Sequence, residues 1–339
     1  MSDPVIAFHH SRENAGRFFT DDDLDCLSQV ARLRFLGSNE FDQIADQLAD
    51  AQVLTGSWGM PKLDTELLAA APQLAAVCYA AGSVKGFVTP EAFERGIRVT
   101  TAMHANAVPV AEITLALILL ANKNWFACQD RIHRISEGAD PRRTWRSLRE
   151  DDHQGNYGTS VGLVGLGAIG RLVLERLRTT DLTVFAYDPH LGDDAITQLG
   201  AEPVAELEQL AARSQVLSLH APNIPATEGM IDARILAAMP DGATFINTAR
   251  GKLVDEAALI AELETGRICA MLDVTHPEPP EPDSPLLSLP NCWLTPHRAG
   301  SSAGEVRRMG RYATEEILRF LAGEPPRHPV TADMLETMA

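Results

Sequence analysis

Four polar side chains in the second half of the chain stand at three predicted strand ends or in the loop that follows one of them. Arg250 follows the apolar run ATFIN, Asp273 ends the run ICAMLD, and His297 follows the run CWLTP. Glu278 comes five residues after Asp273, in a proline-rich loop. Ligands bind outside the carboxyl ends of the strands in open parallel sheets, so we expect these side chains to converge there. A guanidinium suits a pair of substrate oxygens, and an imidazole exchanges protons near neutral pH.

A glycine motif upstream of these residues predicts a dinucleotide site. Gly165, Gly167 and Gly170 form G-x-G-x-x-G after a predicted strand and at the start of a predicted helix. Gly165 would permit a tight turn, Gly167 the close approach of a pyrophosphate, and Gly170 close packing of helix on strand. The helix N-terminus at Ala168 and Ile169 would hold the pyrophosphate. The alternative is a glycine-tightened turn that binds nothing.

Asp188 indicates which dinucleotide the motif would bind. It ends the next predicted strand, LTVFAYD, with 17 residues between Gly170 and it. A carboxylate at this place accepts hydrogen bonds from ribose hydroxyls and would repel a 2′-phosphate. No arginine follows in DPHLGDD, so NAD is favoured over NADP. An ordinary strand-end aspartate is the alternative interpretation.

The elements that must position these residues alternate between strands and helices, which predicts an α/β fold with parallel sheets. The alternation resumes at Gly158, after a long apolar helix from about Pro109 to Asn124 and a polar surface stretch at 135–145. A last helix, Ser302–Gly323, begins where the strands of the second domain stop, so it could return to the first. The strands predicted in the first domain are Val5–Phe8, Arg32–Leu36, Ala51–Gly56, Leu74–Ala80 and Ile97–Thr101.

Composition narrows the class of protein. The chain has 339 residues and a net charge of −17, which disfavours nucleic acid and anionic membranes as partners. Five cysteines without a C-x-x-C pair favour thiols in a reducing cytoplasm and no metal site. The first residues lack the basic and apolar segments of a signal peptide. The apolar run Ala107–Ala121 is short for a membrane span and contains Glu112, so we expect a buried or interface helix.

Taken in order, these motifs resemble the D-isomer-specific 2-hydroxyacid dehydrogenase family. The family pattern of GxGxxG with a downstream Asp, N-x-x-R-G, D-V-x-x-x-E-P and P-H-x-(A/G)-G corresponds here to Gly165–Gly170 with Asp188, NTARG, DVTHPEP and TPHRAG. The resemblance implies two Rossmann-like, doubly wound parallel-sheet domains with a cleft between them. Residues 1–108 plus 302–339 would bind substrate, and residues 109–301 would bind NAD. It also places the helix at 107–121 in the interface of a homodimer.

The resemblance implies hydride transfer between NAD(H) and C2 of a small D-2-hydroxy or 2-oxo acid. Arg250 would bind the substrate carboxylate and C2 oxygen, and His297 would be the acid/base for that oxygen. Glu278 would hydrogen-bond His297, orient it and favour its protonated form. Asp273 would hold the nicotinamide carboxamide.

Further site residues follow from the same resemblance. Pro222 and Thr248 would line the cofactor pocket, and Gly82 and Ser83 would offer backbone N–H groups to the substrate carboxylate. The aspartate that many relatives carry in this last loop is absent from YAAGSVKGFV.

The identity of the acid stays open at the sequence level. Trp58, Lys85 and His104 stand near the predicted substrate loops, where Lys85 or His104 could recognise a second anionic group or simply be solvated. Glyoxylate, hydroxypyruvate, phosphoglycerate and bulkier 2-oxo acids all fit. Two alternatives remain: a phosphite-type dehydrogenase of the same fold, and a non-enzymatic NAD(H)-sensing protein similar to corepressors.

Overall fold

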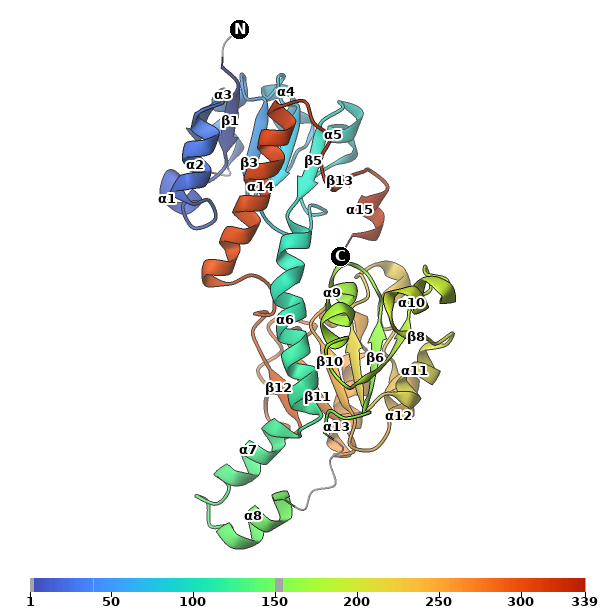
Figure 1. The fold of residues 1–339 in the computed structure, drawn as a ribbon. Coiled ribbons are helices and arrows are strands. Elements are labelled where there is room, and N and C mark those ends of the chain that lie inside the picture. Colours follow the sequence, from blue (N-terminus) through green and yellow to red (C-terminus); the bar gives the residue numbers. More distant parts are fainter. Residues whose placement is uncertain (1–2, 39, 150–154, 339) are drawn as a thin grey trace. The chain divides into compact units, whose positions relative to one another are not determined.

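The computed structural model describes residues 3–38, 40–149 and 155–338. The chain divides into two compact units. Unit 1 comprises Met1–Ala107 and Ser301–Ala339, and unit 2 comprises Val108–Gly300. Each is an α/β structure built on its own sheet (Figure 1).

Unit 1 contains, within its described residues, a six-stranded sheet of order β13-β5-β4-β3-β1-β2. Strands β1 to β5 run parallel, while the short β13 pairs antiparallel with β5. Strands β1, β3 and β4 are buried along their whole length, as expected for strands covered on both faces. The strands are β1 Val5–Phe8, β2 Arg32–Phe35, β3 Val53–Gly56, β4 Ala76–Tyr79, β5 Arg98–Thr101 and β13 Pro329–Val330.

The helices of unit 1 include α14, which comes from the C-terminal part of the chain and packs on β4 and β5 (Figure 1). Its buried Met309, Ala313 and Ile317 belong to the same apolar core as the sheet. Gly310 allows a close approach, because a Cβ there would lie 2.0 Å from the Phe18 carbonyl oxygen. The helices are α1 Arg12–Ala15, α2 Asp21–Ser28, α3 Phe41–Leu48, α4 Thr65–Ala70, α5 Pro90–Glu94, α14 Val306–Leu321 and α15 Met334–Thr337.

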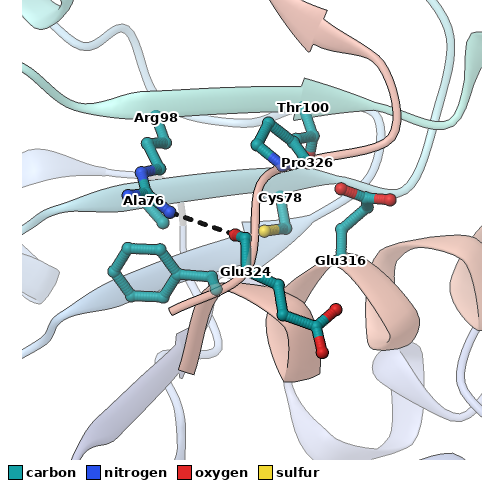
Figure 2. Close-up of a pocket in the computed structure, with 8 residues that line it drawn as sticks. Ala76, Cys78, Arg98, Thr100, Glu316, Glu324 and Pro326 are labelled. Carbon is teal, nitrogen blue, oxygen red and sulfur yellow. Dashed lines mark hydrogen bonds between the residues drawn. The ribbon is translucent and has the colours of Figure 1, made fainter. Parts of the chain in front are cut away.

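Figure 2 shows the seam between α14 and this sheet. The buried Glu316 accepts a hydrogen bond of 2.6 Å from Arg327 Nε, which ties the segment before β13 to the helix. Arg98 donates to the Glu324 carbonyl over 3.3 Å. Burial raises the pKa of the Cys78 thiol to about 12, so this cysteine stays protonated in the seam. The seam encloses only about 10 Å³, room for about one water.

Unit 2 contains, in the part of it that the structure describes, a seven-stranded parallel sheet of order β12-β11-β10-β9-β6-β7-β8. The strands are β6 Ser160–Val164, β7 Thr183–Tyr187, β8 Glu202–Pro203, β9 Val216–Leu219, β10 Thr244–Asn247, β11 Cys269–Leu272 and β12 Cys292–Leu294. Its helices after β6 are α9 Ala168–Leu177, α10 Asp193–Leu199, α11 Leu207–Arg213, α12 Ala233–Ala238 and α13 Glu256–Glu264. Apolar clusters lie on both faces of the sheet. The predicted fold class, two Rossmann-like α/β domains, is confirmed.

Helix α6, Met103–Ala121, begins earlier than the predicted start near Pro109. A proline at the first helical position is favourable, so the sequence suggested a boundary there; the structure keeps Pro109 inside the helix. Among the described helices, α6 alone has the length and composition of a membrane span, with a mean hydropathy of 1.6. The core helix of a globular protein can have the same length and composition. Within unit 2, Glu112 of α6 lies 3.9 Å from Arg176.

The polar stretch at 135–145, predicted as a surface excursion, leads into helix α8, Pro141–Arg149. Asp140 starts this helix by accepting the backbone N–H groups of Arg142 and Arg143, with Pro141 as its first residue. Neither α8 nor the preceding α7, Trp125–His133, contains a buried residue. The stretch is therefore exposed, as predicted, but partly helical.

Candidate active site

The glycine loop between β6 and α9 has the geometry that the motif predicts. Gly165 has a φ of 91°, a left-handed conformation that favours glycine. A Cβ on Gly170 would lie 2.1 Å from the Gly165 carbonyl oxygen, so only glycine lets the helix start this close to the strand. A Cβ on Gly167 would meet nothing within 4 Å, and no side chain caps the helix there. The N-terminus of α9 can therefore receive an anion.

Asp188 follows β7, beside the glycine loop. Its Oδ2 accepts the Leu166 N–H over 2.8 Å, and its Oδ1 accepts the His190 N–H over 2.9 Å. Each carboxylate oxygen has a second lone pair, so both can still accept a ribose hydroxyl. The predicted cofactor role of Asp188 thus fits its contacts, and the carboxylate also fixes the glycine loop.

The turn after β9 carries polar atoms that lack partners among the described residues. These are Nδ1 of the buried His220 and Oδ1 of Asn223. Burial lowers the pKa of His220 to about 4, so its ring is neutral at pH 7. Pro222 lies between them, and its carbonyl accepts the Thr227 hydroxyl over 2.6 Å. Orphaned polar atoms next to an uncapped helix fit a dinucleotide. Asn223 is not among the residues predicted from the sequence, although it directly follows Pro222.

The turn after β10 positions Thr248 and Arg250. The buried Asn247 side chain accepts the Ala249 N–H and donates to the Arg250 carbonyl, each over 2.9 Å. The Thr248 hydroxyl lies 3.0 Å from that of Thr114 on α6, a contact that the sequence alone does not reveal.

The Arg250 guanidinium is half-buried and donates to the Ala249 carbonyl over 2.7 Å. Burial lowers its pKa, and the nearby negative charge of Glu278 opposes that change. An arginine remains protonated under these conditions. The Arg250 guanidinium therefore supplies a fixed positive charge close to Glu278.

Asp273, at the end of β11, has a structural role that was not predicted. Its carboxylate accepts the Thr295 hydroxyl over 2.6 Å and the N–H groups of Arg298 and Ala299 over 2.7 and 2.8 Å. Its carbonyl accepts the His297 N–H over 2.9 Å. Asp273 thus holds the loop that carries His297. The contact with a nicotinamide carboxamide remains a prediction, for which one lone pair on Oδ2 is left.

Glu278 and His297 form the hydrogen bond that the sequence analysis expects. His297 Nδ1 lies 2.7 Å from Glu278 Oε1, and both side chains are nearly half exposed. His297 has a φ of 52°, a left-handed conformation that costs a non-glycine residue on the order of 1 kcal/mol. The partner on Nδ1 leaves Nε2 as the atom that can exchange a proton with a substrate.

The structure thus brings Arg250, Glu278 and His297 together on unit 2. Gly82 and Ser83 belong to unit 1, in the loop after β4, and their substrate role stays a prediction. There the Gly82 carbonyl accepts the Thr101 hydroxyl, and Ser83 Oγ accepts the Lys85 N–H over 3.3 Å.

Two other residues whose roles were left open also lie on unit 1. Trp58 is 53% exposed, with its ring edge-on to Phe18 at 5.6 Å. The His104 ring lies 4.0 Å from that of His328. No group of three His, Cys, Asp or Glu side chains within the described ranges is placed to hold a metal ion.

Unit 2 thus combines a parallel sheet, a G-x-G-x-x-G turn at the start of α9 and an acid/base pair. These features define a nucleotide-binding protein of the dehydrogenase type. Residues 123–299 match the model of the D-isomer specific 2-hydroxyacid dehydrogenase family, NAD binding domain. The chain belongs to this family, and NAD is the cofactor of the matched domain.

Known relatives agree with this assignment. The chain is 33% identical to glyoxylate reductase of Korarchaeum cryptofilum, over 86% of either chain. It is 30% identical to D-3-phosphoglycerate dehydrogenase of Methanocaldococcus jannaschii, over 90% of this chain and 56% of the relative. The chain spans about half the length of the phosphoglycerate dehydrogenases that it matches. The apo structure of Rhodotorula graminis D-mandelate dehydrogenase is similar, with a TM-score of 0.80 at 25% identity, over 97% of this chain and 98% of that one.

Proposed function

We propose that the chain catalyses the NAD-dependent interconversion of a small D-2-hydroxy acid and its 2-oxo acid. The observation that carries this proposal is the 2.7 Å contact between His297 and Glu278, formed close to the charge of Arg250 on an NAD-binding domain. An acid/base with an orienting carboxylate and a fixed cation are what a carbonyl reduction requires from the protein.

Each of these residues has one task in the proposed reaction. The cofactor, when bound, supplies the hydride in reduction and accepts it in oxidation. The Arg250 guanidinium binds the substrate carboxylate and draws electron density toward the C2 oxygen. His297 delivers a proton from Nε2 to that oxygen in reduction and removes it in oxidation. Glu278 holds the ring through Nδ1 and stabilises its positive charge.

The substrate class is a proposal drawn from the relatives. Glyoxylate reductase matches the chain over most of both lengths, whereas the phosphoglycerate dehydrogenases are about twice as long. We therefore place small unphosphorylated 2-oxo acids such as glyoxylate and hydroxypyruvate first, and 3-phosphoglycerate second.

A substrate panel tests this proposal. Glyoxylate, hydroxypyruvate, phenylglyoxylate, phosphohydroxypyruvate and phosphite would each be assayed with NADH or NAD as appropriate, following absorbance at 340 nm. We expect turnover of at least one 2-oxo acid, lost on replacing His297 by Ala. Oxidation of phosphite alone would assign the phosphite-type alternative. Tight NADH binding without any turnover would favour a sensing protein.

Two further proposals concern assembly and location. We propose a homodimer formed through α6, because its apolar surface is only partly covered within the chain and Ile113 is 41% exposed. Light scattering should give twice the 36.8 kDa of one chain, and Ile113→Glu should shift the protein toward the monomer.

We also propose a cytoplasmic location, because five cysteines without a C-x-x-C pair favour free thiols in a reducing compartment. Fractionation of the native cells would test it.

A further inference from the structure

The loop that carries Glu278 is held by a residue outside the motifs. Glu256, the first residue of α13, accepts the backbone N–H of His276 through Oε2 over 3.0 Å. His276 is two residues before Glu278, so this contact fixes the backbone that aims Glu278 at His297. Helix α13 does not need Glu256 as a cap, because Asp255 already accepts the Ala258 N–H over 3.0 Å.

The same loop also lies directly against the loop that carries Arg250. A Cβ on Gly251 would lie 2.1 Å from the carbonyl carbon and oxygen of Thr275, so the two backbones are in contact. A cavity of about 10 Å³ adjoins them, lined in part by Asn247, Glu256 and Thr275. This is room for about one water, with polar side chains to hold it. Glu256 therefore stands where both loops join.

We infer that Glu256 is a positioning residue that acts through Glu278 on the acid/base His297. This inference rests on the proposed function, because it assigns Glu256 a part in the same proton transfer. Without the Glu256 carboxylate, the His276 N–H loses its partner on α13, and the loop between Asp273 and Glu278 loses the hydrogen bond that ties it to this helix. The Glu278 carboxylate then no longer meets Nδ1 of His297 at a hydrogen-bonding distance.

A double-mutant cycle separates this role from a general loss of stability. Glu256→Ala should lower kcat for 2-oxo acid reduction about 10- to 100-fold, as expected for a misplaced catalytic group, with little change in the KM for NADH. In a Glu278→Ala background the same replacement should cost less than about twofold in kcat, because the group that Glu256 positions is already absent. Glu256→Gln keeps an oxygen acceptor and should restore most of the kcat. Equal losses in both backgrounds would overturn the inference.

Asp255→Ala is the matched control, because it removes a carboxylate from the same helix end without touching the loop. It should lower the midpoint of thermal unfolding by about 2–4 °C and leave kcat unchanged.

A second measurement needs no turnover. In protein with 15N-labelled histidine, the Nδ1 signal of His297 should change in Glu256→Ala as it does in Glu278→Ala, and stay unchanged in Asp255→Ala. An unaltered signal in Glu256→Ala would overturn the inference. If the unmodified protein reduced no 2-oxo acid, the proposed function would fail, while this signal would still decide whether Glu256 positions the pair.

Discussion

At the scale of single residues, the hydrogen bond from Nδ1 of His297 to Glu278 gives the two ring nitrogens different roles. Nδ1 orients the imidazole, and Nε2 is left to exchange a proton with the substrate. Reduction needs the ring protonated, since the C2 oxygen gains a proton as the hydride arrives. Oxidation needs it neutral, so that Nε2 can accept the hydroxyl proton. His297→Ala should therefore lower kcat on the order of 10²–10⁴-fold in both directions, as is typical of a lost acid/base. Steady-state rates of reduction and oxidation measure this, and a loss of less than about tenfold in both directions would contradict the role of His297.

Asp188 combines two tasks that a substitution can separate. Its charge should discriminate against a 2′-phosphate, and its hydrogen bond to the Leu166 N–H should hold the glycine loop. NADH should therefore exceed NADPH in kcat/KM. Asp188→Ala should narrow that gap and also weaken NADH binding. Asp188→Asn keeps an acceptor for the loop, so it should lose discrimination with a smaller loss of NADH affinity. Equal use of both cofactors by the unmodified protein would refute the assignment.

His220 links burial to pH-dependent stability. Burial lowers its pKa to about 4 in the folded protein, whereas an unfolded chain restores about 6.5. The unfolded state therefore binds more protons between these values, and the free energy of unfolding falls as pH drops through this window. The contribution is at most about 1.4 kcal/mol per pH unit. Denaturant titrations from pH 7 to 4 should show a shallower decline for His220→Asn than for a control replacement of the exposed His190.

At the scale of elements, runs of apolar residues in the sequence predict strands better than they predict exposed helices. The predicted strand Val5–Phe8 has its observed bounds, because four consecutive apolar residues indicate a buried strand. Helix α8 is short, rich in arginine and has no buried residue, and its clearest sequence signal is the Asp140–Pro141 cap.

In the candidate site, the sequence predicts contacts between side chains better than contacts with the backbone. Side chains with distinctive chemistry, such as Glu278 and His297, could be paired from their motifs. The donors that hold Asp273 are largely N–H groups of Arg298 and Ala299, which any residue possesses. The contact of Glu256 with the His276 N–H is of this kind too. The residue types in the sequence therefore do not show which backbone N–H groups Asp273 and Glu256 bind.

Helix α14 offers a test of how closely elements must pack. A Cβ on Gly310 would lie 2.0 Å from a backbone oxygen of the Phe18 turn, which cannot yield as a flexible side chain would. Gly310→Ala should therefore destabilise the protein by about 1–3 kcal/mol, despite the better helix propensity of alanine. Gly304→Ala is the control, because its Cβ would meet nothing within 4 Å, and should stay within about 0.5 kcal/mol. Urea unfolding of both variants measures the difference.

At the scale of the whole molecule, the two units differ in how the chain completes them. Unit 2 is one continuous segment, Val108–Gly300, with apolar clusters on both faces of its sheet. Unit 1 needs two segments, because Met309, Ala313 and Ile317 of α14 belong to its core and β13 pairs with its β5. Bringing these two distant segments together costs loop-closure entropy, which the apolar contacts of α14 with the sheet must offset. The first segment alone lacks these contacts, so part of its core surface stays exposed.

This difference predicts how fragments behave. Residues 108–300 expressed alone should give a folded domain with a cooperative thermal transition, and should bind NADH through the glycine loop and Asp188. Residues 1–107 alone should expose the apolar surface that α14 covers, and so bind a hydrophobic dye and unfold without a cooperative transition. Joining residues 301–339 to this fragment through a flexible linker should restore cooperative unfolding, because it supplies both α14 and β13. Calorimetry of the three fragments provides the measurement; cooperative unfolding of 1–107 alone would show that the C-terminal segment is dispensable for this core.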